Sequence, residues 1–279
     1  MNPQSSHATE GDVQRNDKDS SNPPESSGAS NTNPNKDDSE YIGDDVMFKD
    51  EGVIRIGLIN IRGIPEKNEN PKNEHTKAMI DATTFDHTGL TEINRQWSQL
   101  DYNHCWYNRI KSWWQNKKSS ISYNNKDINN EAFQPGGTIS LAKEDLTCRV
   151  FKSGQDQLLG RWSWISYRGC NNIVTTVITG YRPCRNMDGN NTNYLQHKRV
   201  LTAMDIHICP REKWLEDISL FIFQRQAESE QVIVIADFNK DINSQRMKKW
   251  ANDLGLKDLL QEKIQASPPT RNNGSVPID

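Results

Sequence analysis

The sequence has few apolar residues and few cysteines for its length. Of its 279 residues, 33% are hydrophobic, which is low for a folded protein. No stretch is apolar for long enough to cross a membrane, and the N-terminus lacks the apolar segment of a signal peptide. The 5 cysteines have no paired short spacing and no Cys-x-x-Cys pattern for zinc, which predicts reduced thiols. We therefore expect an intracellular protein, cytoplasmic or nuclear, with no membrane partner and no disulfide-linked partner.

The deficit of apolar residues is concentrated at the N-terminus. Residues 1–50 are rich in Asn, Ser, Asp, Glu and Pro, and they contain 11 acidic against 4 basic residues. Such a segment cannot bury enough apolar surface to offset the entropy lost on ordering, so we expect a disordered acidic tail. Residues 51–279 carry a net charge of +4 and are long enough for one layered domain. A mildly basic domain permits a polyanionic substrate but does not require one.

Strand-like and helix-like segments are mixed along residues 51–279, which predicts an α/β sheet protein. Short β-branched runs predict strands, and apolar residues at helical spacing predict helices. The segment 161–167 alternates large apolar with small polar residues, so we expect it to be a half-exposed strand. The expected strands are 53–60, 88–93, 137–142, 147–151, 161–167, 173–181 and 231–236, and the expected helices are 73–85, 103–117, 194–207, 212–226 and a short one around 247–254.

Polar residues stand at the ends of several expected strands. Asn60 and Glu92 end the first two, Tyr181 ends another, and Asp237 and Asn239 follow the most strongly predicted strand. If these strands converge, the five side chains form a site of hard oxygen ligands. Magnesium prefers such ligands and keeps several waters, so one or two carboxylates are sufficient. Each residue alone is weak evidence for such a site, because Asp and Asn after a strand commonly form a turn.

Six short blocks occur in the order found in the endonuclease/exonuclease/phosphatase superfamily. They are LINIRG at 58–63, LTEIN at 90–94, PGGTISLA at 135–142, TGYRP at 179–183, ADFN at 236–239 and SVPID at 275–279. Residues 53–279 therefore resemble this superfamily of DNase I-like nucleases, apurinic/apyrimidinic endonucleases, inositol polyphosphate phosphatases and mobile-element endonuclease domains. The middle segment looks closest to the stand-alone or mobile-element-associated members. The resemblance implies a four-layer α/β sandwich of two mixed β-sheets flanked by helices.

The resemblance also implies roles for the residues at the strand ends. Glu92 matches the principal metal ligand, and Asn60 matches the asparagine that helps to hold the metal-bound water or phosphate. Tyr181 and Arg182 are expected at the substrate phosphate. Asp237 matches the aspartate that activates the attacking water.

The remaining blocks imply two more residues and one departure. Asn239 matches the asparagine that orients the water, and it is also expected at the phosphate. Asp279 resembles the aspartate that orients a catalytic histidine in the family. The Ser-Asp-His block that carries this histidine has no counterpart, so we expect a domain that lacks its last strands. Ala236 stands where the family more often has glycine.

The implied activity is phosphodiester hydrolysis with Mg²⁺ or Mn²⁺ as cofactor. The metal neutralises developing charge, a carboxylate activates water, and neutral donors bind the phosphate oxygens. We expect an endonuclease acting on nucleic acid; a phosphatase for a small phosphate ester and a catalytically inactive remnant remain alternatives. Arg161 and Arg168 could also neutralise phosphates. Residues 111–120, KSWWQNKKSS, could stack on single strands, although an amphipathic helix is the favoured interpretation.

Overall fold

The computed structural model describes residues 49–126, 133–185, 187 and 191–264, so the expected acidic tail lies almost wholly outside the described residues. The described chain alternates short strands and helices, and none of its helices is long and apolar enough to cross a membrane. The elements are β1 Ile56–Asn60, α1 Pro71–Ala82, β2 His87–Thr91, α2 Trp106–Lys111, β3 Lys117–Ser122, β4 Thr138–Lys143, β5 Val150–Gln155, β6 Trp162–Arg168, β7 Val174–Tyr181, α3 Asn193–Ala203, α4 Pro210–Ala227, β8 Gln231–Asp237, α5 Gln245–Asp253 and α6 Leu259–Ile264.

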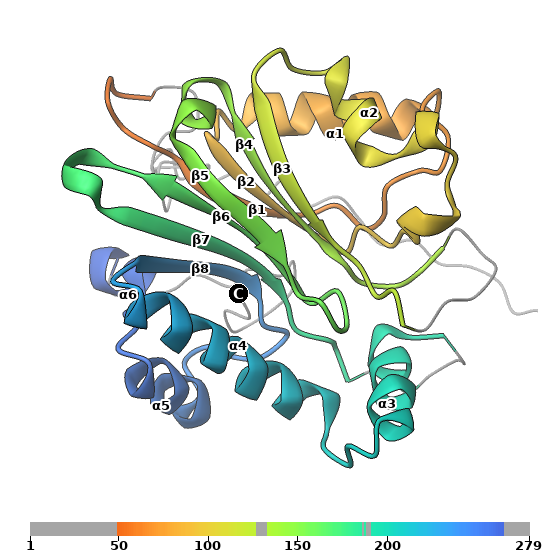
Figure 1. The fold of residues 1–279 in the computed structure, drawn as a ribbon, viewed down its shortest axis with the longest axis vertical. Coiled ribbons are helices and arrows are strands. Elements are labelled where there is room, and N and C mark those ends of the chain that lie inside the picture. The colour runs from red at the N-terminus through yellow and green to blue at the C-terminus, as the bar shows by residue number, and fades with distance from the viewer. Residues whose placement is uncertain (1–48, 127–132, 186, 188–190, 265–279) are drawn as a thin grey trace, which may run out of the picture. The chain divides into compact units, whose positions relative to one another are not determined.

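The strands form two mixed four-stranded sheets that pack face to face (Figure 1). Their orders are β1-β2-β4-β3 and β5-β6-β7-β8. The pairs β1–β2 and β7–β8 are parallel, and the other neighbours are antiparallel. Across the interface β1 contacts β8, β2 contacts β7, β4 contacts β6 and β3 contacts β5. Each parallel pair of one sheet therefore lies against the parallel pair of the other.

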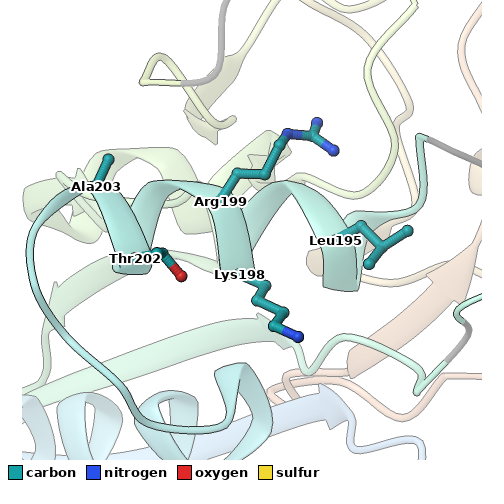
Figure 2. A pocket seen from close by; sticks show the side chains of 5 residues that line it. All are labelled: Leu195, Lys198, Arg199, Thr202 and Ala203. Carbon is teal, nitrogen blue, oxygen red and sulfur yellow. The ribbon is translucent and has the colours of Figure 1, made fainter.

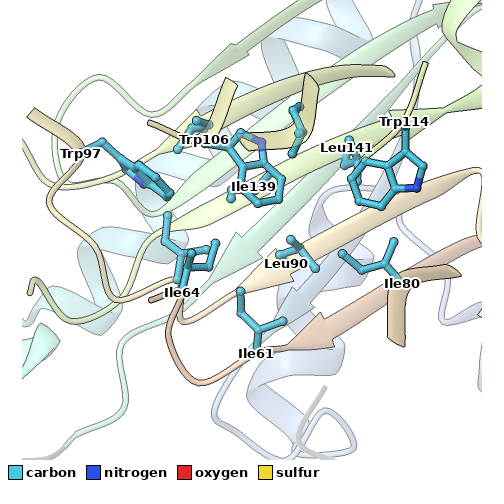
Figure 3. Packing of buried hydrophobic residues seen from close by; sticks show 12 residues of the cluster. Ile61, Ile64, Ile80, Leu90, Trp97, Trp106, Trp114, Ile139 and Leu141 are labelled. Atoms are coloured by element: carbon cyan, nitrogen blue, oxygen red, sulfur yellow. The ribbon is translucent and has the colours of Figure 1, made fainter. Parts of the chain in front are cut away.

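Helices cover the outer face of each sheet and complete four layers (Figure 1). On the first sheet, Ile80 of α1 and Trp106 of α2 pack against Leu90 and Leu141 (Figure 3). On the second sheet, side chains of α4 and α5 pack against β6, β7 and β8 in a second apolar cluster, which includes Trp214. The expectation of a four-layer α/β sandwich with two mixed sheets is confirmed.

The layer between the sheets is lined by hydroxyl groups near the carboxyl ends of the parallel strands. Thr138 and Ser140 on β4 each hydrogen-bond Ser163 on β6, at 3.2 and 3.1 Å, and Ser140 also donates to Thr179 on β7 at 2.8 Å. A Cβ added to Gly89 would lie 2.8 Å from side-chain atoms on the opposite sheet, so the sheets approach closely there. These directional bonds fix the position of one sheet relative to the other.

Three expectations about local structure are wrong. The strand expected over 147–151 begins only at Val150, because Glu144–Arg149 forms a short 3₁₀ helix. The helix expected over 103–117 ends at Lys111, and Lys117–Ser122 forms strand β3 because its backbone pairs with β4. The strand β6 is buried along nearly its whole length rather than half-exposed, since one face meets the other sheet and the other face meets α4. Ser163, a small polar residue of β6, lies where the two sheets approach each other closely.

Candidate functional site at the strand ends

Four of the expected site residues lie at the carboxyl ends of the two parallel strand pairs. Asn60 is the last residue of β1, and Glu92 directly follows β2. Tyr181 and Asp237 are the last residues of β7 and β8 and are register partners. Because carboxyl ends of parallel strands share an edge, each sheet brings two of these side chains to the same edge.

Two hydrogen bonds join these side chains across the sheets. The Asn60 amide donates to Asp237 Oδ2 at 3.4 Å, and the Tyr181 hydroxyl donates to Glu92 Oε1 at 3.2 Å. Each bond runs from one sheet to the other. The structure therefore brings the two carboxylates, the amide and the phenol into one cluster.

Tyr181 is held as a neutral donor. Its side chain is buried, and burial is the largest cause that raises its pKa well above the usual value. The negative charges of Glu92 and Asp237 raise it further, as does the hydrogen bond to Glu92. A phenol in this setting stays protonated at neutral pH and can donate to an anionic oxygen.

Glu92 has an unusual backbone conformation for a residue with a side chain. Its φ is 51°, in the left-handed region, which costs of the order of 1–3 kcal/mol for a non-glycine residue. The segment that follows β1 holds it in place: the Gly63 amide donates to the Glu92 carbonyl at 2.6 Å, and the Ile64 amide donates to the Ile93 carbonyl at 2.9 Å. This conformation turns the chain away from β2 at Glu92, the residue that carries the carboxylate.

Asn239 and Arg182 lie beside Asp237 but use their side chains on the backbone. The Asn239 amide side chain donates to the Arg182 carbonyl at 2.8 Å, and the Asn239 backbone amide donates to Asp237 Oδ1 at 3.0 Å. Arg182 is 3% exposed and donates to the carbonyls of Arg211 and Phe238 at 3.2 and 3.3 Å. Burial, with the nearby Arg211 and Arg246, lowers the Arg182 pKa to about 10. Arg182 therefore lies behind the strand ends and fixes the chain around Asp237.

Arg161 and Arg168 do not join the cluster. Asp279 lies outside the described residues. Arg161 is buried in ion pairs with Asp156 and Asp217, each at 2.8 Å, so the expectation that it neutralises substrate phosphate is wrong. Arg168 lies at the far end of β6, 4.4 Å from the Phe151 ring.

The segment KSWWQNKKSS presents no stacking surface. The Trp114 indole is 7% exposed and donates to Asp81 Oδ1 at 2.8 Å. Trp113 packs edge-to-face against Trp106 and Trp114 at centroid distances of 5.7 and 5.4 Å. These rings belong to the core outside the first sheet, so the aromatic residues stabilise the fold.

The donor set at the strand ends suits a hard divalent cation. Glu92 and Asp237 offer carboxylate oxygens, and Asn60 offers an amide oxygen that already accepts from the Arg62 amide at 3.1 Å. Among the described residues no group of three or more His, Cys, Asp or Glu is placed to hold a metal. A site with two carboxylates fits Mg²⁺, which keeps most of its waters, better than Zn²⁺.

A hollow also runs along α3, away from the strand ends. Its lining residues are Leu195, Lys198, Arg199, Thr202 and Ala203, and the Lys198 and Arg199 side chains extend in different directions (Figure 2). None of the strand-end residues lines it. Sequence reasoning did not single out two asparagines that hydrogen-bond the turn at Pro135–Gly136, Asn94 and Asn193, although Asn94 falls within the LTEIN block.

Comparison with known proteins finds similarity at the level of structure. No protein-family model and no curated protein matches the sequence. The human Nocturnin catalytic domain with bound sulfate aligns at TM-score 0.48 and 15% identity, over 77% of this chain and 77% of that chain. The 3′ phosphatase NExo from Neisseria, bound to a product DNA hairpin, aligns at 0.45 and 14%, over 75% and 74%. An AP endonuclease from Archaeoglobus fulgidus aligns at 0.40 and 12%, over 76% and 69%. The solved structures to which this chain is similar thus include members of the endonuclease/exonuclease/phosphatase superfamily.

Proposed function

We propose that this chain is a magnesium-dependent phosphodiester hydrolase that acts on nucleic acid. One observation carries the proposal: Asn60, Glu92, Tyr181 and Asp237 converge from four strands of two sheets and are joined by two cross-sheet hydrogen bonds. Residues far apart in the chain meet there with two carboxylates and two neutral donors. This combination suits binding of a divalent cation together with a phosphate group.

Each side chain has one task in the proposed reaction. Glu92 and Asn60 would hold the cation, which supplies charge neutralisation at the phosphate and at the leaving oxygen. Asp237 accepts a proton from the attacking water as the water oxygen bonds to phosphorus. The ester P–O bond then breaks, and the leaving oxygen takes a proton from solvent. Tyr181 donates to a phosphate oxygen, and Asn239 orients the water.

Nucleic acid is the substrate class that the charge of the domain supports. Residues 51–279 have a net charge of +4, whereas the tail has a net charge of −7. A basic surface attracts a polyanion over a longer distance than it attracts a small ester with a single phosphate. Hydrolysis of a small phosphate ester at the same site is the second outcome that an assay must measure.

The test is an assay of two substrates with matched variants. We expect the chain to nick supercoiled plasmid in MgCl₂ and to release little phosphate from inositol phosphates. Glu92→Ala should lower nicking by about 100-fold, since it removes a metal ligand. Asp253→Asn, which removes an exposed carboxylate paired with Lys249 on α5, should leave the rate unchanged. Equal rates for Glu92→Ala and the unaltered chain would show that the site is misplaced, and release from inositol phosphates alone would identify a phosphatase.

A further inference from the structure

A second left-handed residue lies close to Glu92. The φ of Asn94 is 49°, against 51° for Glu92, so two strained residues flank Ile93. Strained conformations persist only where surrounding contacts fix them. On one side these contacts come from Gly63 and Ile64, as described above. The contacts on the other side come from a loop that has no role in the proposed reaction.

That loop is the Pro-Gly-Gly turn before β4. The Gly136 amide donates to Asn94 Oδ1 at 2.7 Å, and the Asn94 amide donates to the Gly136 carbonyl at 2.9 Å. Gly136 has a φ of 90°, which favours glycine. The reciprocal pair of bonds ties the chain two residues after Glu92 to the turn.

Asn193, the first residue of α3, holds the turn from behind. Its side-chain amide donates to the Pro135 carbonyl at 3.0 Å, and it is 8% exposed. A Cβ added to Gly136 would lie 2.1 Å from Asn193 Nδ2, so the amide packs directly against the turn. A backbone carbonyl only accepts hydrogen bonds, and Asn193 must therefore present its NH₂ group to Pro135.

The Asn193 amide nitrogen has two polar neighbours, and only the Pro135 carbonyl can accept its hydrogen bond. Asn193 Nδ2 also lies 3.3 Å from His197 Nε2. That ring nitrogen lies 3.1 Å from the Leu159 carbonyl, which can only accept, so it carries the proton and cannot accept from Asn193. Asn193 Oδ1 is buried with no hydrogen-bond partner among the described residues. A buried oxygen without a partner costs free energy. This cost offsets part of what the hydrogen bond to Pro135 contributes to stability, and the amide donor fixes the turn.

We propose that Asn193 and Asn94 are positioning residues that hold Glu92 in its metal-binding orientation through the turn at Pro135–Gly136. The inference rests on the function proposed above, since it assigns to Glu92 the role of metal ligand. The order of contact is Asn193 to Pro135, Gly136 to Asn94, and Asn94 to the strained backbone at Glu92. Contacts that orient a metal ligand commonly change affinity for the metal when they are lost.

The test measures binding of Mn²⁺ alone to the full chain by electron paramagnetic resonance. We expect Asn193→Ala to weaken binding about tenfold, by loss of a contact that orients the ligand. Asn193→Asp keeps the shape of the side chain but presents only acceptors to Pro135, so it should also weaken binding. Added negative charge by itself would tighten cation binding, which makes this direction specific to positioning. Thr202→Ala, on the same helix, is the matched control and should bind as the unaltered chain does.

Asn94 accepts a hydrogen bond from the turn, whereas Asn193 donates one to it. Asn94 Oδ1 accepts from Gly136, so Asn94→Asp should retain Mn²⁺ binding whereas Asn94→Ala should weaken it about tenfold. Gly136→Ala should weaken binding because its methyl group would collide with Asn193. In the double variant with Asn193→Ala the collision is relieved but the strain of alanine at a φ of 90° remains, so the two effects should add only in part.

The outcomes separate the positioning role from the proposed function. Suppose that Glu92→Ala abolishes Mn²⁺ binding while Asn193→Ala and Asn193→Asp bind as the unaltered chain does: the positioning role is then wrong and the metal site stands. If the unaltered chain binds no Mn²⁺, or Glu92→Ala binds equally well, the metal site is wrong and the positioning role is wrong with it. Thermal melting of each variant establishes that the folded protein was measured, and Gly136→Ala gives an independent result if Asn193→Ala fails to fold.

Discussion

Near the strand ends, the layer between the two sheets and the layers outside them are built from different side chains. At the opposite end, the layer between the sheets is an apolar cluster that includes Ile165 and Val177. Between the sheets, near the strand ends, the contacts are hydroxyl groups and a glycine: Ser140 bonds both Ser163 and Thr179, and Gly89 leaves no room for a methyl group. Outside the sheets, the contacts are tryptophan, isoleucine and leucine side chains, as in the cluster around Trp106 (Figure 3).

This difference separates two tasks. Burial of large apolar side chains gives a free energy that depends on area and hardly on direction. Hydrogen bonds between hydroxyls depend on both distance and angle, so they set where one sheet lies against the other. The Asn60–Asp237 and Tyr181–Glu92 bonds cross the same interface. We infer that the outer layers supply most of the stability and that the inner layer sets the geometry of the site.

The largest effect is expected from the outer layer. Trp106 is fully buried, and Trp106→Ala should lower the free energy of unfolding by about 3–5 kcal/mol. Urea unfolding measures this loss. Mn²⁺ affinity of the folded variant, measured at low temperature, should remain within about twofold, because Trp106 lies on α2 in the layer outside the first sheet. A large fall in affinity would mean that the outer layer also sets the site, and Trp106→Phe is the matched smaller change.

Lowering the pH tests the layer between the sheets at the end away from the candidate site. His87 on β2 lies 2.6 Å from the Tyr167 hydroxyl of β6, and burial lowers its pKa to about 3. The unfolded chain takes up this proton below about pH 6.5 while the folded chain does not. Stability from this group is therefore complete above about pH 6.5 and is lost as pH falls towards 3, by about 2–3 kcal/mol at pH 4.5. His87→Gln should remove this part of the pH dependence of urea unfolding; an unchanged dependence would show that water reaches the ring.

A methyl group between the sheets should affect stability and site together. In Gly89→Ala the new Cβ would meet Ile235 and Thr179 at 2.8 Å, which should cost about 1–3 kcal/mol through overpacking. Because the sheets must separate to admit the methyl group, Mn²⁺ affinity should also fall. Gly169→Ala, where the nearest atom is the Ile173 carbonyl at 3.3 Å, is the control. Loss of stability with unchanged Mn²⁺ affinity would contradict the geometric role of the inner layer.

The smallest effect is expected from a single hydroxyl. Ser163→Ala removes the partner of Thr138 and Ser140 and should lower the free energy of unfolding by about 1–2 kcal/mol. Ser153→Ala on the exposed face of β5 should change it by less than about 0.5 kcal/mol. Equal values for the two variants in urea unfolding would show that the hydroxyl network contributes nothing beyond an exposed serine.

The fold class and most elements were predictable from local pattern, and the exceptions have physical causes. The run at 231–236 predicts β8 because its β-branched residues suit a strand wherever it lies. Because the tryptophans before Lys117 have helical spacing, the expected helix extended past Lys111, where α2 ends. Pairing of Lys117–Ser122 with β4 is a long-range choice that local spacing cannot encode.

The candidate site was predictable in its members but not in its internal contacts. The resemblance selected Asn60, Glu92, Tyr181 and Asp237, and the structure brings all four together. Arg182 was also expected at the phosphate. Nothing in the sequence around it indicates that its side chain donates to the carbonyls of Arg211 and Phe238. Burial of a polar side chain depends on the elements packed around it, which no single segment specifies.

The sequence by itself determined most of the strands and helices and which polar residues end the strands, because period and residue type act over a few neighbouring positions. Only the tertiary structure decided which of these ends meet. Asn60 and Asp237 are 177 positions apart, and Glu92 and Tyr181 are 89 apart. Their approach depends on two parallel pairs stacked against each other, with hydroxyl groups between the sheets that fit at one separation of the sheets.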